Sequence, residues 1–469
     1  MLYSFATILA VAIGLFAAPV CGQELSAQDR AALEARKEAL FQRMLRDPAN
    51  LDVSFAYADV SARLGDNEAA VSALERMLLF NPNLPRVDLE LGALYFRMGS
   101  FEVAQSYFDK AAAANPPPEV QARINQYRAQ IASEANAGKV TGFLFMGGQY
   151  QSDANVAPGS GLIASPFFPF LLQLNNQFKK AEDGNLFLTG SVLYTYDLGT
   201  QNRDQIEVTG TGFVDHFFKF GRLDLDLGEV TAGPRLRFPD PAIPYVAEVT
   251  VKPYGILNEV GLGENQYFDT YGAGLESTAI VFQDLGVRTS FEFRQKSFSN
   301  APDRPLSTGL NGNDKLVTIA LTKPLAIPFS IPGLTNLDST LNVEFDFLDQ
   351  STRFAFYSNK SYAGYVGYRL RYDDPTGIVR LPWETTIYGS RTYANYAQPD
   401  PCCNTSPNPL TPGSSDRYDR RWRFGITQSF SVADRIAIVV QAQRDIVSSN
   451  LSLYGYTSNS ILIGPQLRF

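Results

Sequence analysis

Apolar and polar residues alternate with a period of two through most of the chain after about residue 138. In the stretch STLNVEFDFL, Leu341, Val343 and Phe345 fall on one face of an extended chain, and Glu344 and Asp346 fall on the other. This period is that of a β-strand, because successive side chains point to opposite sides of a sheet. The second part of the chain is therefore predicted to be all-β.

About fourteen such segments lie between Val140 and Phe469, and many run about ten residues or more. Strands of soluble proteins average about five or six residues, whereas about ten are needed to cross the hydrocarbon of a membrane. The expected connections are long after odd-numbered strands, at 152–184, 297–314 and 398–419, and short after even-numbered ones, at 199–203, 283–284 and 432–434. Residues 139–469 are therefore predicted to form an antiparallel β-barrel in the outer membrane of a Gram-negative bacterium.

Before residue 138 the sequence is rich in helix-forming residues, and recurring prolines and glycines mark a repeat. Pro48, Pro82 and Pro116 follow one another at intervals of 34 residues, and the same interval separates Gly65 from Gly99. This period is the signature of the tetratricopeptide repeat, a pair of antiparallel helices. The second repeat matches that family's pattern of small and large positions at Leu91, Gly92, Tyr95, Ala104, Phe108, Ala111 and Pro116.

A single repeat of this kind cannot bury its apolar face, so the stacking of neighbouring repeats makes the core. Residues 23–138 are therefore predicted to form an all-α solenoid, with helices near 27–46 and 118–137 capping its two ends. Two roles for this domain stay open. It is either a spacer or folding aid, or a concave groove that holds a peptide or a passing protein partner.

The first residues, MLYSFATILAVAIGLFAAPVCGQ, contain an apolar run followed by small residues. This is the pattern of a secretory signal peptide, predicted over residues 1–22 with cleavage near Gly22. Cys21 suggests a lipid anchor, but Pro19 and Val20 are poor neighbours for that modification. No later stretch has the roughly 18 consecutive apolar residues of a membrane helix, which excludes a helical membrane protein.

The composition narrows the classes of partner and cofactor. The net charge is −8 and no basic patch counters it, which argues against a nucleic-acid partner. After signal cleavage only Cys402 and Cys403 remain, too few for a framework of several disulfides or for a cysteine-based zinc site. They could form a vicinal disulfide, a bridge to another chain, or neither. No cofactor or metal is expected.

The polar face of the predicted strands carries charges of both signs, as expected for a water-filled lumen. The candidate lumen residues are Asp224, Asp226, Arg288, Glu292, Arg294, Glu344, Asp346, Arg369, Arg371 and Arg423. Every sizeable barrel has a polar interior, so these residues favour passage of a solute or chain without identifying it. The apolar stretch SPFFPFLLQL in the first long loop is expected either to plug the lumen or to contact cargo or lipid.

Catalysis is not expected. A serine hydrolase of the Ser–His type needs a general base, and the single histidine, His216, follows Asp215 near the end of a predicted strand. A histidine at the rim of a barrel is ordinary there. The acidic residues Asp224 and Asp226 are interpreted as alternate lumen positions rather than as a catalytic pair.

The chain ends in GPQLRF, in which Gly464, Leu467 and Phe469 resemble the C-terminal signal that the barrel-assembly machinery recognises in outer-membrane proteins. The physical reading agrees, because a free last strand can add to the edge of a sheet, with alternate side chains fixing its register. Phe469 is expected to close the barrel against the first strand, which removes an exposed edge.

A periplasmic tetratricopeptide domain followed by a barrel of about fourteen strands resembles the surface lipoprotein assembly modulators. A local match lies in GGQYQSDANVAP, at Gly147, Asp153, Asn155, Ala157 and Pro158. The resemblance implies movement of a secreted protein or lipoprotein across the outer membrane, with the repeats recruiting the cargo or a chaperone. Two alternatives stay open: an exopolysaccharide export porin, and a general porin with a docking domain.

Overall fold

The protein was analysed as a computed structural model. It describes residues 27–47, 50–134, 138–158, 162–165, 168–173, 179–239, 241–282, 284–327, 333–379, 381–400 and 416–469. The predicted signal peptide and the pair Cys402 and Cys403 lie outside the described residues. The chain divides into two compact units, Met1–Ala137 and Gly138–Phe469.

The described part of the first unit consists of helices joined by short turns. They are α2 (Ala27–Arg46), α3 (Leu51–Arg63), α4 (Asn67–Phe80), α5 (Pro85–Arg97), α6 (Phe101–Ala113) and α7 (Pro118–Glu134). Gly65 lies in the turn between α3 and α4 with φ +84°. Gly99 lies at the equivalent position between α5 and α6 with φ +75°. Only glycine adopts this backbone readily, so the 34-residue interval marks two equivalent helix pairs. No described helix is both long and apolar enough to span a membrane.

The second helix pair packs around a glycine, as its sequence pattern predicts. A Cβ added to Gly92 on α5 would lie 2.7 Å from the ring of Phe108 on α6. Leu91, Ala104 and Phe108 are fully buried. Tyr95 is half-buried, and its hydroxyl donates a hydrogen bond of 2.7 Å to Glu75 on α4, which raises the pKa of Tyr95 to about 12. The two pairs are therefore joined by a polar contact as well as by apolar packing.

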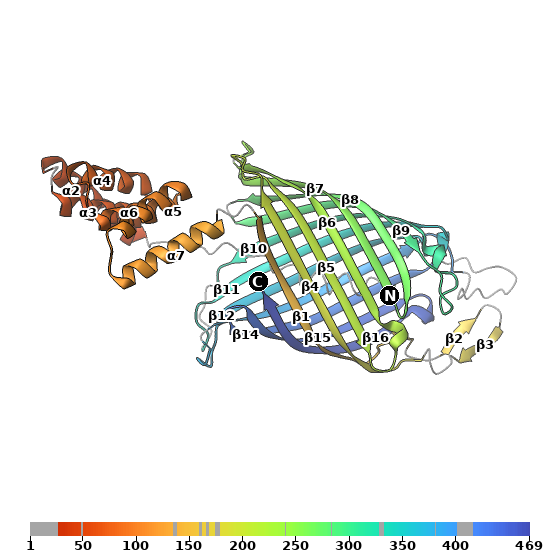
Figure 1. Ribbon diagram of the computed structural model, residues 1–469. Coiled ribbons are helices and arrows are strands. Elements are labelled where there is room, and N and C mark those ends of the chain that lie inside the picture. Colours follow the sequence, from red (N-terminus) through yellow and green to blue (C-terminus); the bar gives the residue numbers. More distant parts are fainter. Residues whose placement is uncertain are drawn as a thin grey trace. The chain divides into compact units, whose positions relative to one another are not determined.

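Fourteen strands close the second unit into an antiparallel barrel (Figure 1). Its strands are β1 (Gly138–Gln151), β4 (Asp183–Asp197), β5 (Gln205–Phe217), β6 (Leu225–Pro239), β7 (Val246–Leu262), β8 (Asn265–Val281), β9 (Leu285–Phe298), β10 (Gly312–Leu325), β11 (Asp338–Thr352), β12 (Asn359–Asp373), β13 (Pro382–Tyr396), β14 (Tyr418–Ala433), β15 (Ile436–Ser449) and β16 (Tyr456–Arg468). Each pairs with its neighbours in the chain, and β1 also pairs with β16. A separate pair, β2 (Leu162–Ser165) and β3 (Phe168–Gln173), lies in the connection after β1, where the apolar stretch SPFFPFLLQL falls.

Ion pairs that skip strands identify the inner face of the wall. Arg294 on β9 bonds to Glu229 on β6 at 2.6 Å, although β7 and β8 stand between these strands. Such a contact is possible only on the concave side of a closed sheet. The opposite face carries exposed apolar side chains, such as Leu257 at 65%, Ile387 at 57% and Ile461 at 57%. The outer face is therefore suited to hydrocarbon and the inner face to water.

The two ends of the barrel differ. We call the end where β1 begins and β16 ends the C-terminal rim, and the opposite end the loop rim. The loop rim carries the long connections 152–182, 299–311 and 397–417, whereas the C-terminal rim has short ones at 198–204, 282–284 and 434–435. Several connections depart from the expected alternation. At the loop rim 218–224, 263–264, 353–358 and 450–455 are short, and at the C-terminal rim 326–337 and 374–381 are longer. The three longest connections lie at the loop rim, but the remaining ones do not follow strand parity.

Candidate functional site

The closure between β1 and β16, which we call the seam, is incomplete at its centre. Residues 143–145 pair with 466–468, and residues 148–151 pair with 460–463. Between these two runs, Met146 and Gly147 face Gly464 and Pro465 without continuing the ladder. Pro465 has no backbone donor, which removes one possible hydrogen bond there. A comparable interruption occurs between β6 and β7 at residues 233–235, so the seam is weakened but is not unique in this.

Two glycines permit the close approach of the strands at this interruption. A Cβ on Gly147 would lie 2.3 Å from the carbonyl oxygen of Ile463, and one on Gly464 would lie 1.9 Å from that of Met146. Neither position can hold a larger residue without separating the strands. Gly147, predicted as part of a first-strand motif, and Gly464, predicted as part of the assembly signal, therefore meet in one structural feature.

Phe469 fastens the seam at the C-terminal rim. Its backbone N–H donates to the carbonyl of Gly142 at 3.0 Å, and its carbonyl accepts from the Gly142 N–H at 2.8 Å. Its ring lies over the same glycine, because a Cβ on Gly142 would be 2.9 Å from the ring edge. Beyond this point residues 138–141 of β1 have no partner from β16. The last residue thus ends the ladder while leaving a short free edge on β1.

The connection after β1 fastens the seam at the loop rim. The Ser152 N–H donates to the Asn459 carbonyl at 2.9 Å, the Ser458 hydroxyl donates to the Asp153 carbonyl at 3.2 Å, and Lys180 donates to the Thr457 carbonyl at 3.0 Å. These contacts reach from both ends of the connection to the first residues of β16. They form a clasp over the seam.

The other residues of the predicted first-strand motif, Asp153, Asn155, Ala157 and Pro158, form hydrogen bonds and packing contacts within this clasp. Asp153 is fully buried, and one of its carboxylate oxygens accepts from the Ala157 N–H at 3.1 Å, whereas the other has no partner among the described residues. Burial raises the pKa of Asp153 to about 6. The Asn155 side chain donates to the Lys179 carbonyl at 2.6 Å and accepts from the Ala181 N–H at 3.1 Å. Pro158 is buried beside them.

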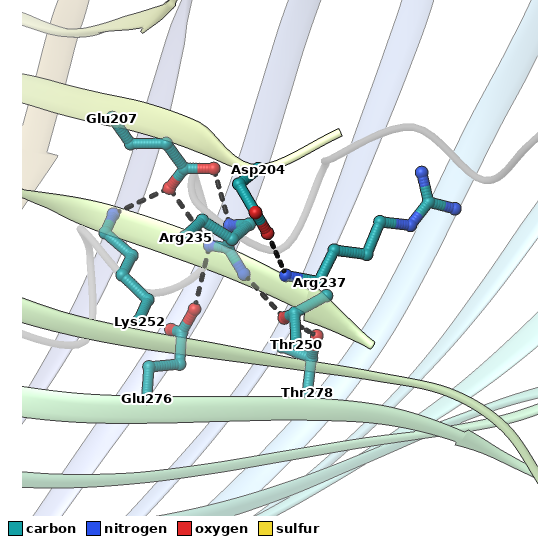
Figure 2. Close-up of polar contacts among 8 residues, drawn as sticks. All are labelled: Asp204, Glu207, Arg235, Arg237, Thr250, Lys252, Glu276 and Thr278. Carbon is teal, nitrogen blue, oxygen red and sulfur yellow. Dashed lines mark hydrogen bonds and ion pairs between the residues drawn. The ribbon is translucent and has the colours of Figure 1, made fainter. Parts of the chain in front are cut away.

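An ion network that sequence reasoning did not single out lies on the inner wall across β5 to β8. The Arg235 guanidinium bonds to Glu207 at 2.5 Å, to Glu276 at 3.0 Å and to the Thr250 hydroxyl at 3.0 Å, and Lys252 bonds to Glu207 at 2.8 Å. Figure 2 shows the Arg235 side chain between these partners. These residues are far apart in the sequence, so only the register of the strands could have revealed the cluster.

Similar pairs continue around the wall and include half of the predicted lumen residues. Arg294 bonds to Glu292 as well as to Glu229, and Arg288 bonds to Glu344 at 3.0 Å. Asp346 accepts from the Thr318 hydroxyl at 2.7 Å. By strand register, eight of the predicted residues share the inner face: Arg288, Glu292, Arg294, Glu344, Asp346, Arg369, Arg371 and Arg423. The inner wall is thus charged, with opposite signs side by side.

The prediction was wrong for Asp224 and Asp226. Asp226 pairs with the exposed Val214 and lies on the outer face, and Asp224 precedes β6 in a turn. In the stretch RLDLDLG it is the leucines that point inward, because Leu223 packs with Phe217 against Ala154 from the connection after β1. Near the loop rim the connection after β1 covers the inner face of β6, and the inner face is apolar there. At this level the outer face carries the charged residue instead.

His216 lies on the outer face at the loop rim with its side chain 73% exposed. Its Nδ1 is 2.6 Å from an Asp224 carboxylate oxygen, and no serine contacts it among the described residues. Within the described ranges, no group of three or more His, Cys, Asp or Glu could hold a metal ion.

The helical unit contains an open pocket of about 520 Å³ between α2 and the turn from α3 to α4. Phe41, Tyr57 and Leu64 provide apolar lining. The ion pair between Lys37 and Asp66 closes one side, and the hydrogen bond between them lowers the pKa of Asp66 and raises that of Lys37. A short side chain with an apolar body would fit such a pocket.

No family model matches the chain, and no curated protein sequence matches it. Several solved helical repeat structures are similar to part of it. MamA is 14% identical, with 24% of this chain and 67% of that one covered and a TM-score of 0.21. The type III secretion chaperone SycD of Yersinia enterocolitica, in complex with a peptide of the translocator YopD, is 12% identical, with coverages of 28% and 95% and a TM-score of 0.22. The TPR domain of P58(IPK) is 18% identical, with coverages of 23% and 31% and a TM-score of 0.21.

The architecture follows from the geometry of the chain itself. Two helix pairs repeat at 34 residues with glycines of positive φ at equivalent turns. They precede a closed barrel of fourteen antiparallel strands with an apolar outer face and a charged inner face. This combination is that of an outer-membrane protein with a tetratricopeptide-like domain.

Proposed function

We propose that this protein moves a secreted protein or lipoprotein to the outer surface of a Gram-negative cell, and that its helical unit lies in the periplasm and recruits the cargo or a chaperone. One observation carries the proposal. Only residues 135–137 separate the end of α7 from the start of β1, and β1 is a strand of the weakened seam. The helical unit is therefore joined in sequence, through three residues, to a strand of the seam, so a cargo recruited by the repeats would be recruited to this barrel.

The inner wall supports passage of a polypeptide. Several of its arginines are matched by neighbouring carboxylates, as in the pairs of Arg235 with Glu207 and of Arg294 with Glu229. A wall on which positive and negative charges neutralise each other does not bind either positively or negatively charged residues strongly. A polypeptide of mixed sequence would therefore pass without being held at one point. Paired side chains also remain hydrogen-bonded as a chain passes.

The orientation rests on the two rims. Barrels of the bacterial outer membrane place short turns in the periplasm and long loops outside. The three longest connections lie at the loop rim, and the chain enters β1 from the helical unit at the C-terminal rim. With this orientation the helical unit and Phe469 are periplasmic, where the barrel-assembly machinery would meet the last strand. The proposed role involves no catalytic step.

The experiment is surface proteomics in a strain that lacks the gene. Intact cells are treated with a protease that cannot cross the outer membrane, and the released peptides are compared with those of the complemented strain. We expect a small set of proteins to disappear from the surface while persisting in the periplasm. Loss of all outer-membrane proteins, or loss of none, would contradict the proposal.

Export of a polysaccharide is the second candidate, favoured by one observation. Tyr365 and Tyr388 face the lumen and stack with ring centroids 6.1 Å apart, and flat aromatic surfaces suit sugar rings. The same deletion strain distinguishes the two candidates. Loss of a surface glycan with an unchanged surface proteome would favour this second function, whereas increased exclusion of small solutes alone would favour a porin.

A further inference from the structure

We propose that the outer face of β13 to β15 near the loop rim binds the phosphate groups of an anionic lipid in the outer leaflet. Its ligands are Arg391, Arg420 and Arg444, which we call the arginine patch. The proposal goes beyond the transport function and does not depend on it. It requires only that the barrel spans the outer membrane with its loop rim outward.

Strand register places the three arginines together on the outer face. Arg420 pairs with Tyr393, Arg391 with Trp422, and all four side chains share one face of β13 and β14. Arg444 on β15 pairs with Phe424 on β14, which follows Trp422 on the same face. All three arginines are exposed. They lie on three neighbouring strands, within four residues of one another in register.

No carboxylate balances this patch among the described residues. The inner-face arginines of the same strand, Arg421 and Arg423, both bond to Asp445 at 2.9 Å. By contrast, Arg391 and Arg420 contact only aromatic rings, and no ion pair is formed by Arg444. A cluster of three cations without anions is unfavourable unless a ligand supplies the negative charge.

The arginine patch lies where the apolar outer face of the barrel ends toward the loop rim. Closer to the C-terminal rim, Ile387, Ile426 and Ala442 face outward at one level of the three strands, because Ile426 pairs with both Ile387 and Ala442. Trp422 and Phe424 are exposed beside the arginines at 38% and 48%. Aromatic side chains collect at membrane interfaces, so this level corresponds to the headgroups of the leaflet.

The geometry suits phosphate in particular. The Arg391 guanidinium lies 4.7 Å from the centre of the Trp422 ring, and Arg420 lies 5.5 Å from the centre of Tyr418. Stacking on a ring restrains a guanidinium while leaving its N–H groups free at the edge. A restrained guanidinium binds phosphate oxygens through two parallel hydrogen bonds, which an ammonium cannot do.

Outward charges near the loop rim differ around the barrel. On β6 to β8 they are acidic: Asp226, Glu259 and Asp269. On β10 to β12 both signs lie side by side, because Asp349 pairs with Lys315 and Lys360. On β13 to β15 the outward charges near this rim are the three arginines, so this part of the wall offers positive charge to an anionic headgroup.

The test measures binding of lipid A, a glycolipid with two phosphates, to the purified full-length protein in neutral detergent micelles. Dephosphorylated lipid A and inorganic phosphate are the comparison ligands. The wild type should bind lipid A, and the triple variant R391Q/R420Q/R444Q should bind it about tenfold or more weakly, because charge-assisted hydrogen bonds are lost. The triple variant with lysine at the same positions should recover only part of the affinity.

Lys315→Gln on β10 is the matched control for Arg391→Gln, because Lys315 is also exposed on the outer face near the loop rim. Heat-modifiable migration on gels establishes that each variant is folded, and the single variants replace the triple variant if it does not assemble. Equal binding by wild type and folded arginine variants would overturn the proposal. So would equal binding of dephosphorylated lipid A, full competition by inorganic phosphate, or a loss at Lys315→Gln as large as at Arg391→Gln.

Discussion

Gly92 illustrates how a single residue position can be predicted from sequence and then located in the structure. The repeat pattern predicts a small residue there, and the ring of Phe108 occupies the space that a side chain would need. Asp226 illustrates the opposite case. Alternation separates two faces of a strand but does not say which face is inside, and a covering loop made the inner face apolar at that level.

Gly92→Leu should destabilise the helical unit by about 1–3 kcal/mol, because the new side chain overlaps the Phe108 ring. Two-step thermal unfolding of the full chain, followed by circular dichroism, should show a lower first transition and an unchanged barrel transition. Gly65→Ala is the control, since it meets no neighbouring atom and strains only the positive φ of the turn. Lower stability of the barrel in Gly92→Leu would contradict the independence of the two units.

Asp153→Asn should stabilise the clasp at neutral pH. Because burial raises the pKa of Asp153 to about 6, the folded clasp favours the protonated acid. The stability contribution is therefore fully present below the ordinary carboxyl pKa, falls as pH rises from there because the open clasp ionises more readily than the closed one, and is lost above about 6. Asn cannot ionise and keeps an oxygen for the Ala157 N–H.

The measurement is hydrogen exchange at Ala157 and Ser152 in wild type and Asp153→Asn at about pH 3 and about pH 8, corrected for intrinsic rates. We expect equal protection at the lower pH, below the ordinary carboxyl pKa, and stronger protection in the variant at the higher pH, by on the order of 2–3 kcal/mol. The same difference at both pH values would mean that ionisation of Asp153 does not govern the clasp.

At the scale of elements, the number and type of strands followed from the alternating pattern, but their pairing did not. A strand sequence fixes two faces and leaves register to turn lengths and to long-range contacts. The seam shows the consequence. Gly147 and Gly464 were singled out in two separate motifs of the sequence, and only the register shows that they face each other. The ion network of Arg235 was missed for the same reason.

A disulfide across the seam tests whether it opens during transport. Gly147 cannot hold a cysteine, so the register directs the pair to Gln149 and Leu462, which face each other. Gln149→Cys with Leu462→Cys, with Cys402 and Cys403 changed to serine, should block surface display under oxidising conditions and restore it with reductant. A disulfide between Ala442 and Ile461, in the adjacent β15–β16 pair, is the control. Full display through the locked seam would exclude opening there.

Phe469→Asp should slow barrel assembly because it places a charge on the ring position over Gly142. The folded, heat-modifiable form in outer-membrane fractions should fall several-fold, while export across the inner membrane continues. Phe238→Asp is the control, because Phe238 is also exposed near the C-terminal rim. Similar losses in both variants would make Phe469 an ordinary apolar contact rather than part of an assembly signal.

At the scale of the whole molecule, the two-unit organisation was accessible from sequence because each unit has its own period, 34 residues in the helical repeats and two in the strands. The inner wall was accessible only in part. Which charges meet on it depends on shear and register, and those are properties of the closed sheet. Transport itself is a hypothesis. It combines the three-residue connection between α7 and β1, the interrupted seam, and the paired opposite charges of the inner wall.

The most direct measurement is site-specific photo-cross-linking at two neighbouring positions of β9 in living cells. Ser290 pairs with Thr318 on the inner face, and Thr289 pairs with the exposed Ile319 on the outer face. A photoreactive residue at Ser290 should cross-link the protein whose surface display depends on this barrel, and one at Thr289 should not. Continued display of that protein with no cross-link at Ser290, or equal cross-links at both positions, would contradict passage through the barrel.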